Sequence, residues 1–326
     1  MHRRSVFAAF GVTLLAATVP GIACAQAPYP SRVISMVVPF PAGGPNDIIA
    51  RIVAAGLQQA LHQSVIIDNR GGAGGNLGIA YVARANPDGY TLLFTSTAIA
   101  VNPGLFANLP YDPIKDFAPI SEIVSAPNVL FVRPDSGITS IADLVAKVKA
   151  DPDKFNYASP GVGTKSHLTG ELFKLRAGVN IQHIPYRGGG PATQALVSGQ
   201  VQLASVALAP VEPLIKSGTV RALAVTGPER WYSLPDVPTM IESGYPGFIS
   251  DTFNAMFAPA GTPPEIVALL VKHVREIMKR PEVVDAAQKH GYQIVAGTPE
   301  QMSVRLVTEI AGVKELVARA GIKPEN

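Results

Sequence analysis

Two glycine-containing loops in this sequence carry groups that could bind a small anion. The first, residues 39–47, follows an apolar run and precedes a segment whose apolar residues have helical spacing. Glycine lets backbone N–H groups approach a ligand closely, and a helix N-terminus favours an anion because its first N–H groups have no partner within the helix. The alternative is a tight turn in which Asp47 is only a helix N-cap. The candidate ligand-binding residues in this loop are Pro41, Ala42, Gly43, Gly44 and Asp47.

The second loop, within residues 157–167, has the same order of strand end, glycines and helix start. The hydroxyls of Ser159 and Thr164 and the backbone N–H groups of residues 163–165 would form another anion site. Thr164 is also expected to cap the following helix, which does not exclude contact with a ligand. Gly161 and Gly163 complete this second set, and a helix N-terminus at each loop suits a ligand with carboxylates.

Ser96 and Thr97 follow an expected strand at residues 90–94. Ligands of open α/β sheets bind at the carboxyl ends of the strands, so these hydroxyls would lie at the same sheet edge as the first loop. The two residues could orient a polar ligand, or they could only cap a turn.

Motifs for catalysis, metals and cofactors do not fit this chain. The Gly-Thr-Lys-Ser run at 163–166 lacks the Gly-Lys pair of a phosphate-binding loop, and the glycines at 71–78 do not match a dinucleotide fingerprint. A G-x-S-x-G elbow and closely spaced metal-ligating histidines are also missing. We therefore predict a binding protein with no catalytic residues, metal or cofactor. The alternatives are an exported hydrolase or isomerase that uses Ser159 and His167, and a solute sensor for a signalling partner.

The beginning of the chain predicts export. Arg3 and Arg4 precede an apolar run at 6–19 and small residues at 23–25, which is typical of a signal peptide comprising residues 1–25. The run is shorter than the roughly 18 apolar residues that usually cross a membrane. Cleavage after residue 25 would place the mature protein in the periplasm and remove Cys24; lipidation of Cys24 is the minor alternative. The net charge of +3 would fall to +1, which argues against a nucleic-acid partner.

The pattern of elements predicts an α/β protein with two lobes. Apolar strands alternate with amphipathic helices over residues 33–94 and again over 129–225, which indicates parallel sheets covered on both faces. After residue 246 only one strand is expected, at 253–257, followed by three amphipathic helices that lack a sheet of their own. We therefore expect residues 26–127 and 247–326 to form a discontinuous first lobe, residues 128–246 to form the second, and two segments to serve as a hinge.

Several motifs, in order along the chain, resemble those of the Bug family of extracytoplasmic solute receptors. They are Tyr-Pro at 29–30, the segment 39–51, the glycine-rich stretch 71–78, Pro-Asp-Gly-Tyr-Thr-Leu-Leu at 87–93, Pro-Tyr-Asp-Pro at 110–113, His-Ile-Pro-Tyr at 183–186, Leu-Pro-Asp-Val-Pro-Thr at 234–239 and Ala-Pro-Ala-Gly-Thr-Pro at 258–263. The resemblance covers essentially the whole mature chain.

This resemblance implies a periplasmic binding protein type II-like fold, or Venus flytrap, that acts as a monomer and delivers a small organic acid to a two-subunit membrane permease. It also implies that backbone amides and ordered water at residues 41–47 hold the carboxylate, and that residues 159–164 contribute from the second lobe. Members of the family often carry an acidic pair where this chain has Gln202 and Val206. The uncharged Val206 therefore predicts an apolar or aromatic acid, and Phe253, in place of a frequent tryptophan, weakly favours an altered pocket.

Overall fold

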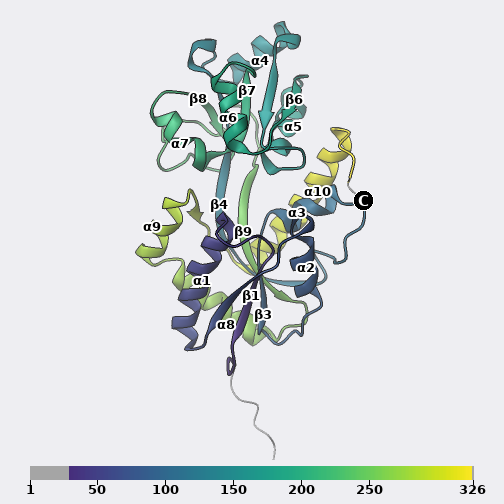
Figure 1. The fold of residues 1–326 in the computed structure, drawn as a ribbon, viewed down its shortest axis with the longest axis vertical. Helices are drawn as coiled ribbons and strands as arrows, with labels where there is room; N and C mark the ends of the chain where they lie inside the picture. Colours follow the sequence, from purple (N-terminus) through teal and green to yellow (C-terminus); the bar gives the residue numbers. More distant parts are fainter. Residues whose placement is uncertain (1–28, 325–326) are drawn as a thin grey trace, which may run out of the picture.

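The computed structural model describes residues 29–324, so the predicted signal peptide at residues 1–25 lies outside the described part. The chain forms two α/β lobes stacked along the long axis of the molecule and joined by two strands, β4 (Phe117–Val132) and β9 (Asp251–Pro259) (Figure 1). Among the described residues, no helix is both long and apolar enough to cross a membrane.

The first lobe contains a mixed sheet with the strand order β2-β1-β3-β9-β4. Its strands are β1 (Ile34–Val38), β2 (Val65–Asn69), β3 (Thr91–Ser96), β9 (Asp251–Pro259), the first part of β4 (Phe117–Val132) and the short β10 (Gln293–Ile294). The first three strands are parallel, as expected, whereas β9 runs antiparallel to both β3 and β4. The expectation of purely parallel sheets is therefore wrong, because β9 returns from the second lobe.

Helices cover both faces of the first sheet. One apolar core lies between the sheet and the helices α1 (Pro45–Leu61), α8 (Pro264–Ile277) and α9 (Pro281–Lys289). A second core lies on the opposite face, under α2 (Asn76–Ala83), α3 (Ala98–Leu105) and α10 (Pro299–Arg319). The C-terminal helices thus pack on the same sheet as the N-terminal strands.

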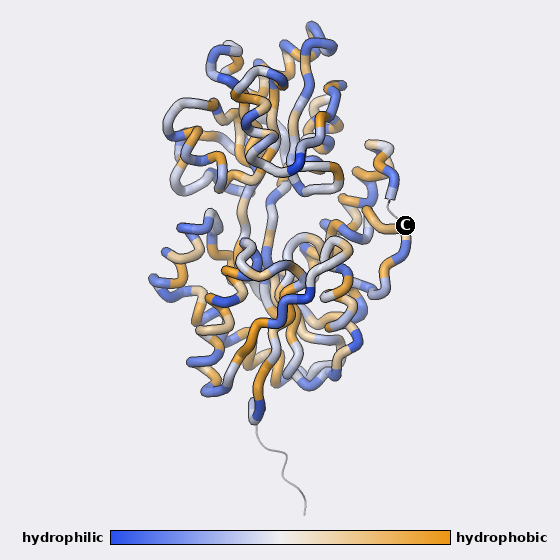
Figure 2. The backbone as a smooth tube through the Cα atoms, viewed as in Figure 1, coloured by the Kyte–Doolittle hydropathy of each residue, from blue (hydrophilic) through white to orange (hydrophobic). Residues whose placement is uncertain are grey.

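The second lobe has the same layered construction. Its strands are the last part of β4, β5 (Asn156–Ser159), β6 (Gln182–Pro185), β7 (Leu203–Ala207) and β8 (Arg221–Val225). One core is formed with α4 (Ile141–Ala150) and α5 (Lys165–Ala177), and the other with α6 (Gly189–Val197) and α7 (Leu208–Lys216). Short 3-10 turns lie at Pro134–Ser136 and Pro152–Lys154 in this lobe and at Ala73–Gly75 in the first lobe. Figure 2 shows apolar segments concentrated within the lobes and polar segments on their outer loops.

The two lobes meet at a buried polar crossing between strands. Strand β4 is 16 residues long and takes part in both sheets, while β9 begins beside it with Pro127 opposite Asp251. At the crossing, the Asn128 side chain donates to the Ser250 carbonyl at 2.9 Å and the Asn128 N–H donates to Thr226 Oγ1 at 2.9 Å. Because these groups are buried and hydrogen-bonded, they fix the conformation of the chain where β4 and β9 pass between the lobes. Each lobe nevertheless keeps its own apolar cores.

Candidate ligand-binding site

The first glycine loop leads directly into the N-terminus of α1. Gly44 is the N-cap, in an extended conformation, and no side chain caps the helix. Pro41, Ala42 and Gly43 are exposed. The interpretation of Asp47 as the N-cap is therefore wrong. The N-terminus of α1 has no capping side chain to compete with an anion for its N–H groups.

Asp47 is a buried residue that holds the loop in shape. Its carboxylate accepts hydrogen bonds from Gly43 N at 2.9 Å, Arg51 Nε at 2.8 Å and Asn69 Nδ2 at 2.9 Å, and the residue is 1% exposed. Burial disfavours the ionised form, but these hydrogen bonds and the charge of Arg51 outweigh it and lower the pKa of Asp47. Asp47 thus stabilises the conformation of the loop from its buried side.

The other predicted residues of the first lobe lie where β3 ends. Ser96 Oγ accepts from Ala98 N at 3.3 Å, the Thr97 N–H donates to the Phe253 carbonyl at 3.0 Å, and both residues are buried. In the sheet, Ser96 is directly opposite Asn254 of β9.

Sequence reasoning missed a contact between this strand and α1. The Asn254 side chain donates to Asn46 Oδ1 in the first turn of α1, next to the loop. Asn254 is fully buried, and its Oδ1 has no hydrogen-bond partner among the described residues. A lone asparagine within the apolar β9 segment was the available signal, because an uncompensated buried polar group is costly.

The second glycine loop is closed by its own hydrogen bonds. Thr164 caps α5 by accepting from His167 N at 3.2 Å and donates to the Gly161 carbonyl at 2.8 Å, which confirms its predicted capping role. Ser159 is buried, accepts from Gly161 N at 3.2 Å and lies 2.7 Å from His183 Nε2. Its hydroxyl is therefore engaged within the loop.

Two stacked histidines lie behind this loop. The His167 and His183 ring centroids are 4.1 Å apart, and the Gly163 N–H donates to His167 Nδ1 at 3.1 Å. Burial, and then the neighbouring His167, lower the pKa of His183 to about 4; burial also lowers the pKa of His167. Both rings are therefore neutral at pH 7. Ser159 pairs with His183, so the hypothetical Ser159–His167 catalytic pair does not form.

The second loop also approaches the first lobe. A Cβ atom on Gly163 would lie 3.1 Å from Leu105 Cδ1, at the end of α3. Val206, by contrast, is 1% exposed and packs in the core beneath α6 and α7. Its position favours a packing role, and it does not line the surface between the lobes.

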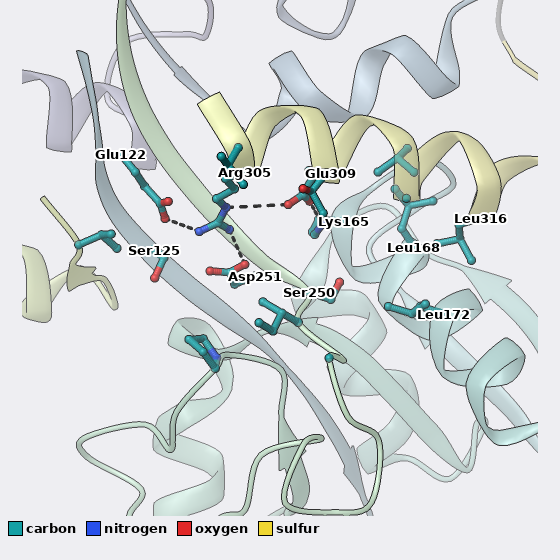
Figure 3. A pocket seen from close by; sticks show the side chains of 18 of the residues that line it. Glu122, Ser125, Lys165, Leu168, Leu172, Ser250, Asp251, Arg305, Glu309 and Leu316 are labelled. Atoms are coloured by element: carbon teal, nitrogen blue, oxygen red, sulfur yellow. Dashed lines mark hydrogen bonds and ion pairs between the residues drawn. The ribbon is translucent and has the colours of Figure 1, made fainter. Parts of the chain in front are cut away.

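A groove of ≈ 1150 Å³ lies between the lobes beside the two crossing strands, lined by β10, α5, α10 and the segment before β9 (Figure 3). Arg305 of α10 donates to Glu122 of β4 and, at 2.6 Å, to Asp251 of β9. Burial, partly offset by Arg305, raises the pKa of Glu122 to about 7. None of the predicted ligand-binding residues lines this groove.

The fold and these loops define a two-lobe periplasmic binding protein, and comparisons with known proteins identify its family. The profile of the family described as "Tripartite tricarboxylate transporter family receptor" matches residues 49–322. Protein BugT of Bordetella pertussis is 38% identical over 325 residues, covering 99% of each chain, and a protein from Pseudomonas sp. strain P51 is 38% identical over 290 residues, covering 89% of this chain and 86% of that one. The chain belongs to this receptor family, and it is a binding protein rather than an enzyme.

Solved structures of related receptors confirm the predicted two-lobe fold. A TctC solute-binding protein from Polaromonas, without ligand, has a TM-score of 0.82 at 29% identity, covering 89% of this chain and 99% of that one. Rpa4515 of R. palustris with adipate has a TM-score of 0.73 at 36% identity, covering 91% and 100%. MatC from Rhodopseudomonas palustris with bound malate has a TM-score of 0.69 at 33% identity, covering 89% and 100%.

Proposed function

We propose that this protein traps a small carboxylate between its lobes in the periplasm and delivers it to a two-subunit membrane permease. The observation that carries the proposal is the N-terminus of α1, which has no side-chain cap and follows an exposed glycine loop. The glycine loop before α5 supplies backbone N–H groups for the ligand from the other lobe. Contacts from both lobes favour the closed form, because only interactions that differ between two states can shift their equilibrium. We further propose that the receptor acts as a monomer after removal of residues 1–25.

The ligand we favour is an aliphatic dicarboxylate. Adipate and malate, named in the descriptions of two relatives, both have two carboxylates. The uncapped N-terminus of α1 would match one carboxylate, and the loop before α5, where Thr164 caps the helix, would match the other with the backbone N–H groups that the cap leaves free. The expectation of an apolar or aromatic acid rested on an uncharged Val206 at the site, and it loses that support because Val206 is buried in a core.

We propose that the lobe arrangement described here is the open form. The structure superposes better on the receptor without ligand, at a TM-score of 0.82, than on those with adipate or malate, at 0.73 and 0.69. Sequence identity alone would place the receptor without ligand last, since the three values are 29%, 36% and 33%. The higher TM-score with the receptor that has no ligand therefore supports our proposal that this structure is the open form.

The proposed lobes comprise residues 26–127 with 247–326, and residues 128–246. The boundary between residues 246 and 247 needs a small adjustment, because Phe248 packs in the second-lobe core beside Met240. We therefore place that crossing near Ser250, whose carbonyl is bonded to Asn128.

Titration calorimetry of the mature protein tests this function. The panel contains aliphatic dicarboxylates, their diamides and sugars. We expect at least one diacid to bind with a Kd of about 1 μM, equivalent to about 8 kcal/mol, and its diamide to bind at least about tenfold more weakly because charge-assisted hydrogen bonds are lost. Heat from sugars or diamides, with none from any acid, would contradict the proposal.

A further inference from the structure

Helices α5 and α10 connect the two lobes through an ion pair. Lys165 is the first residue of α5, directly after the cap Thr164, and its Nζ pairs with Glu309 Oε1 on α10 (Figure 3). The two side chains are only 12% and 14% exposed. Within residues 29–324, this is the one ion pair that joins a residue of the first lobe to a residue of the second.

An apolar cluster continues the same contact. Leu168 of α5 is buried together with three residues of α10 and one of α3, namely Val313, Leu316, Val317 and Val101. The close approach of Gly163 to Leu105 lies at the end of this contact. First-lobe side chains therefore hold the helix that bears the second glycine loop.

The two partners are fixed to different lobes. Arg305, one turn before Glu309, binds Glu122 and Asp251 of the strands β4 and β9, so α10 is tied to the first lobe. Helix α5 is tied to the second lobe, where Ser205 Oγ donates to the Ser166 carbonyl at 2.8 Å. A rotation of the lobes about the crossing strands must therefore change the distance between α5 and α10.

We propose that the Lys165–Glu309 pair and the apolar cluster beneath it form an interlobe latch that stabilises the open form. This inference rests on the proposed function, in which ligand binds the closed form. The apparent Kd equals the Kd of the closed form divided by the fraction of receptor that is closed. A contact made only in the open form lowers that fraction and therefore weakens binding, whether or not its residues also contact the ligand.

The test is the variant Glu309→Gln, which keeps the size of the side chain and removes its charge. Arg305 retains Glu122 and Asp251, so the main change is that Lys165 loses its partner. We expect the Kd for the best diacid to fall about tenfold, equivalent to about 1.4 kcal/mol. The matched control is Glu315→Gln, because Glu315 pairs with Arg319 of its own helix in an exposed position, and it should leave the Kd unchanged.

A distance measurement provides a readout that does not depend on the ligand. Spin labels at Gln58→Cys and Lys149→Cys, exposed positions on α1 and α4, report the separation of the lobes. Without ligand, Glu309→Gln should shift the population toward shorter distances, and Leu316→Ala, which removes apolar contact, should shift it the same way. Unchanged distances, or an unchanged or weaker affinity, would overturn the latch. If no acid binds even the wild-type protein, the proposed function fails, while the distances still decide whether the latch exists.

Discussion

The substitution Asp47→Asn removes the charge at the centre of the first loop with almost no change in shape. The carboxylate accepts three hydrogen bonds, from Gly43, Arg51 and Asn69, at 2.8–2.9 Å. An asparagine keeps one acceptor oxygen, which can still bond the Gly43 N–H, but its NH₂ group then faces the NH₂ of Asn69. Asn69 cannot simply turn, since its Nδ2 also donates to the Phe40 carbonyl at 3.1 Å.

The expected cost of Asp47→Asn is about 2–4 kcal/mol of unfolding free energy. A hydrogen bond to a buried charged group contributes about 1.5–3 kcal/mol, and leaving the Asn69 donor unsatisfied adds about 1 kcal/mol. The Arg51 contact adds less than about 1 kcal/mol, because that side chain is 56% exposed. Since the pKa of the folded Asp47 lies below its ordinary 3.8, this stabilisation is present above that pH and is lost as the pH falls below it.

Urea unfolding at pH 7 measures this cost from the shift in midpoint at constant slope. The control is Asp68→Asn, because Asp68 also pairs with an arginine, Arg70, but is partly exposed and should cost less than about 1 kcal/mol. Equal costs for the two variants, or no cost for Asp47→Asn, would refute the argument that the buried carboxylate holds the loop.

The remaining predictions concern both loops. Gly43→Ala should cost about 1–2 kcal/mol in urea unfolding from its left-handed backbone alone, since φ is +80° and nothing lies within 4 Å of a new Cβ; a cost near zero would contradict this. The pKa of His183 is about 4 in the folded protein and near 6.5 when unfolded, so the unfolded state binds more protons between these values and stability should fall by about 2.5 kcal/mol as pH drops from 6.5 to 4. A His183→Gln variant, followed by thermal unfolding across this range, should lose most of that slope. Ser159→Ala should weaken ligand binding by a few-fold through the loop that it bonds, measured by calorimetry; unchanged affinity would mean that the loop is not part of the site.

Regular elements with clear periodicity were predictable from the sequence. The apolar spacing of residues 47–61 and of 164–176 predicts two helices, and the structure has α1 and α5 there, each within two residues at either end. Ser140 followed three residues later by Asp143 predicts a helix start at this position, and the structure confirms it, because the Ser140 side chain accepts from Asp143 N at 3.1 Å and caps α4. These features are local, so local patterns reveal them.

The longest strand was predicted only in part. Its first part contains Pro119, Glu122 and Pro127, which argue against a central strand, so the sequence predicts a strand only for the apolar residues 129–132. Two register shifts against β9 accommodate this segment, at 119/121 and at 122/124. Helix α3 was missed as well, since Pro103 lies inside it.

The geometry of the site was less predictable, because it depends on tertiary contacts. The sequence identified both loops, but it could not show that Ser159 pairs with His183, 24 residues away, or that Asn254 meets Asn46, 208 residues away. The sequence also could not show which face of β7 carries Val206, because a shift of one residue in register moves every side chain of a strand to the opposite face.

A crystal structure with the tightest-binding diacid tests the central claim most directly. We predict density for one carboxylate within hydrogen-bond distance of the backbone N–H groups at the start of α1, between Gly43 and Asp47, and for the other against residues 161–165. Density on a single lobe, or in the groove between α10 and the crossing strands, would contradict capture between the two loops.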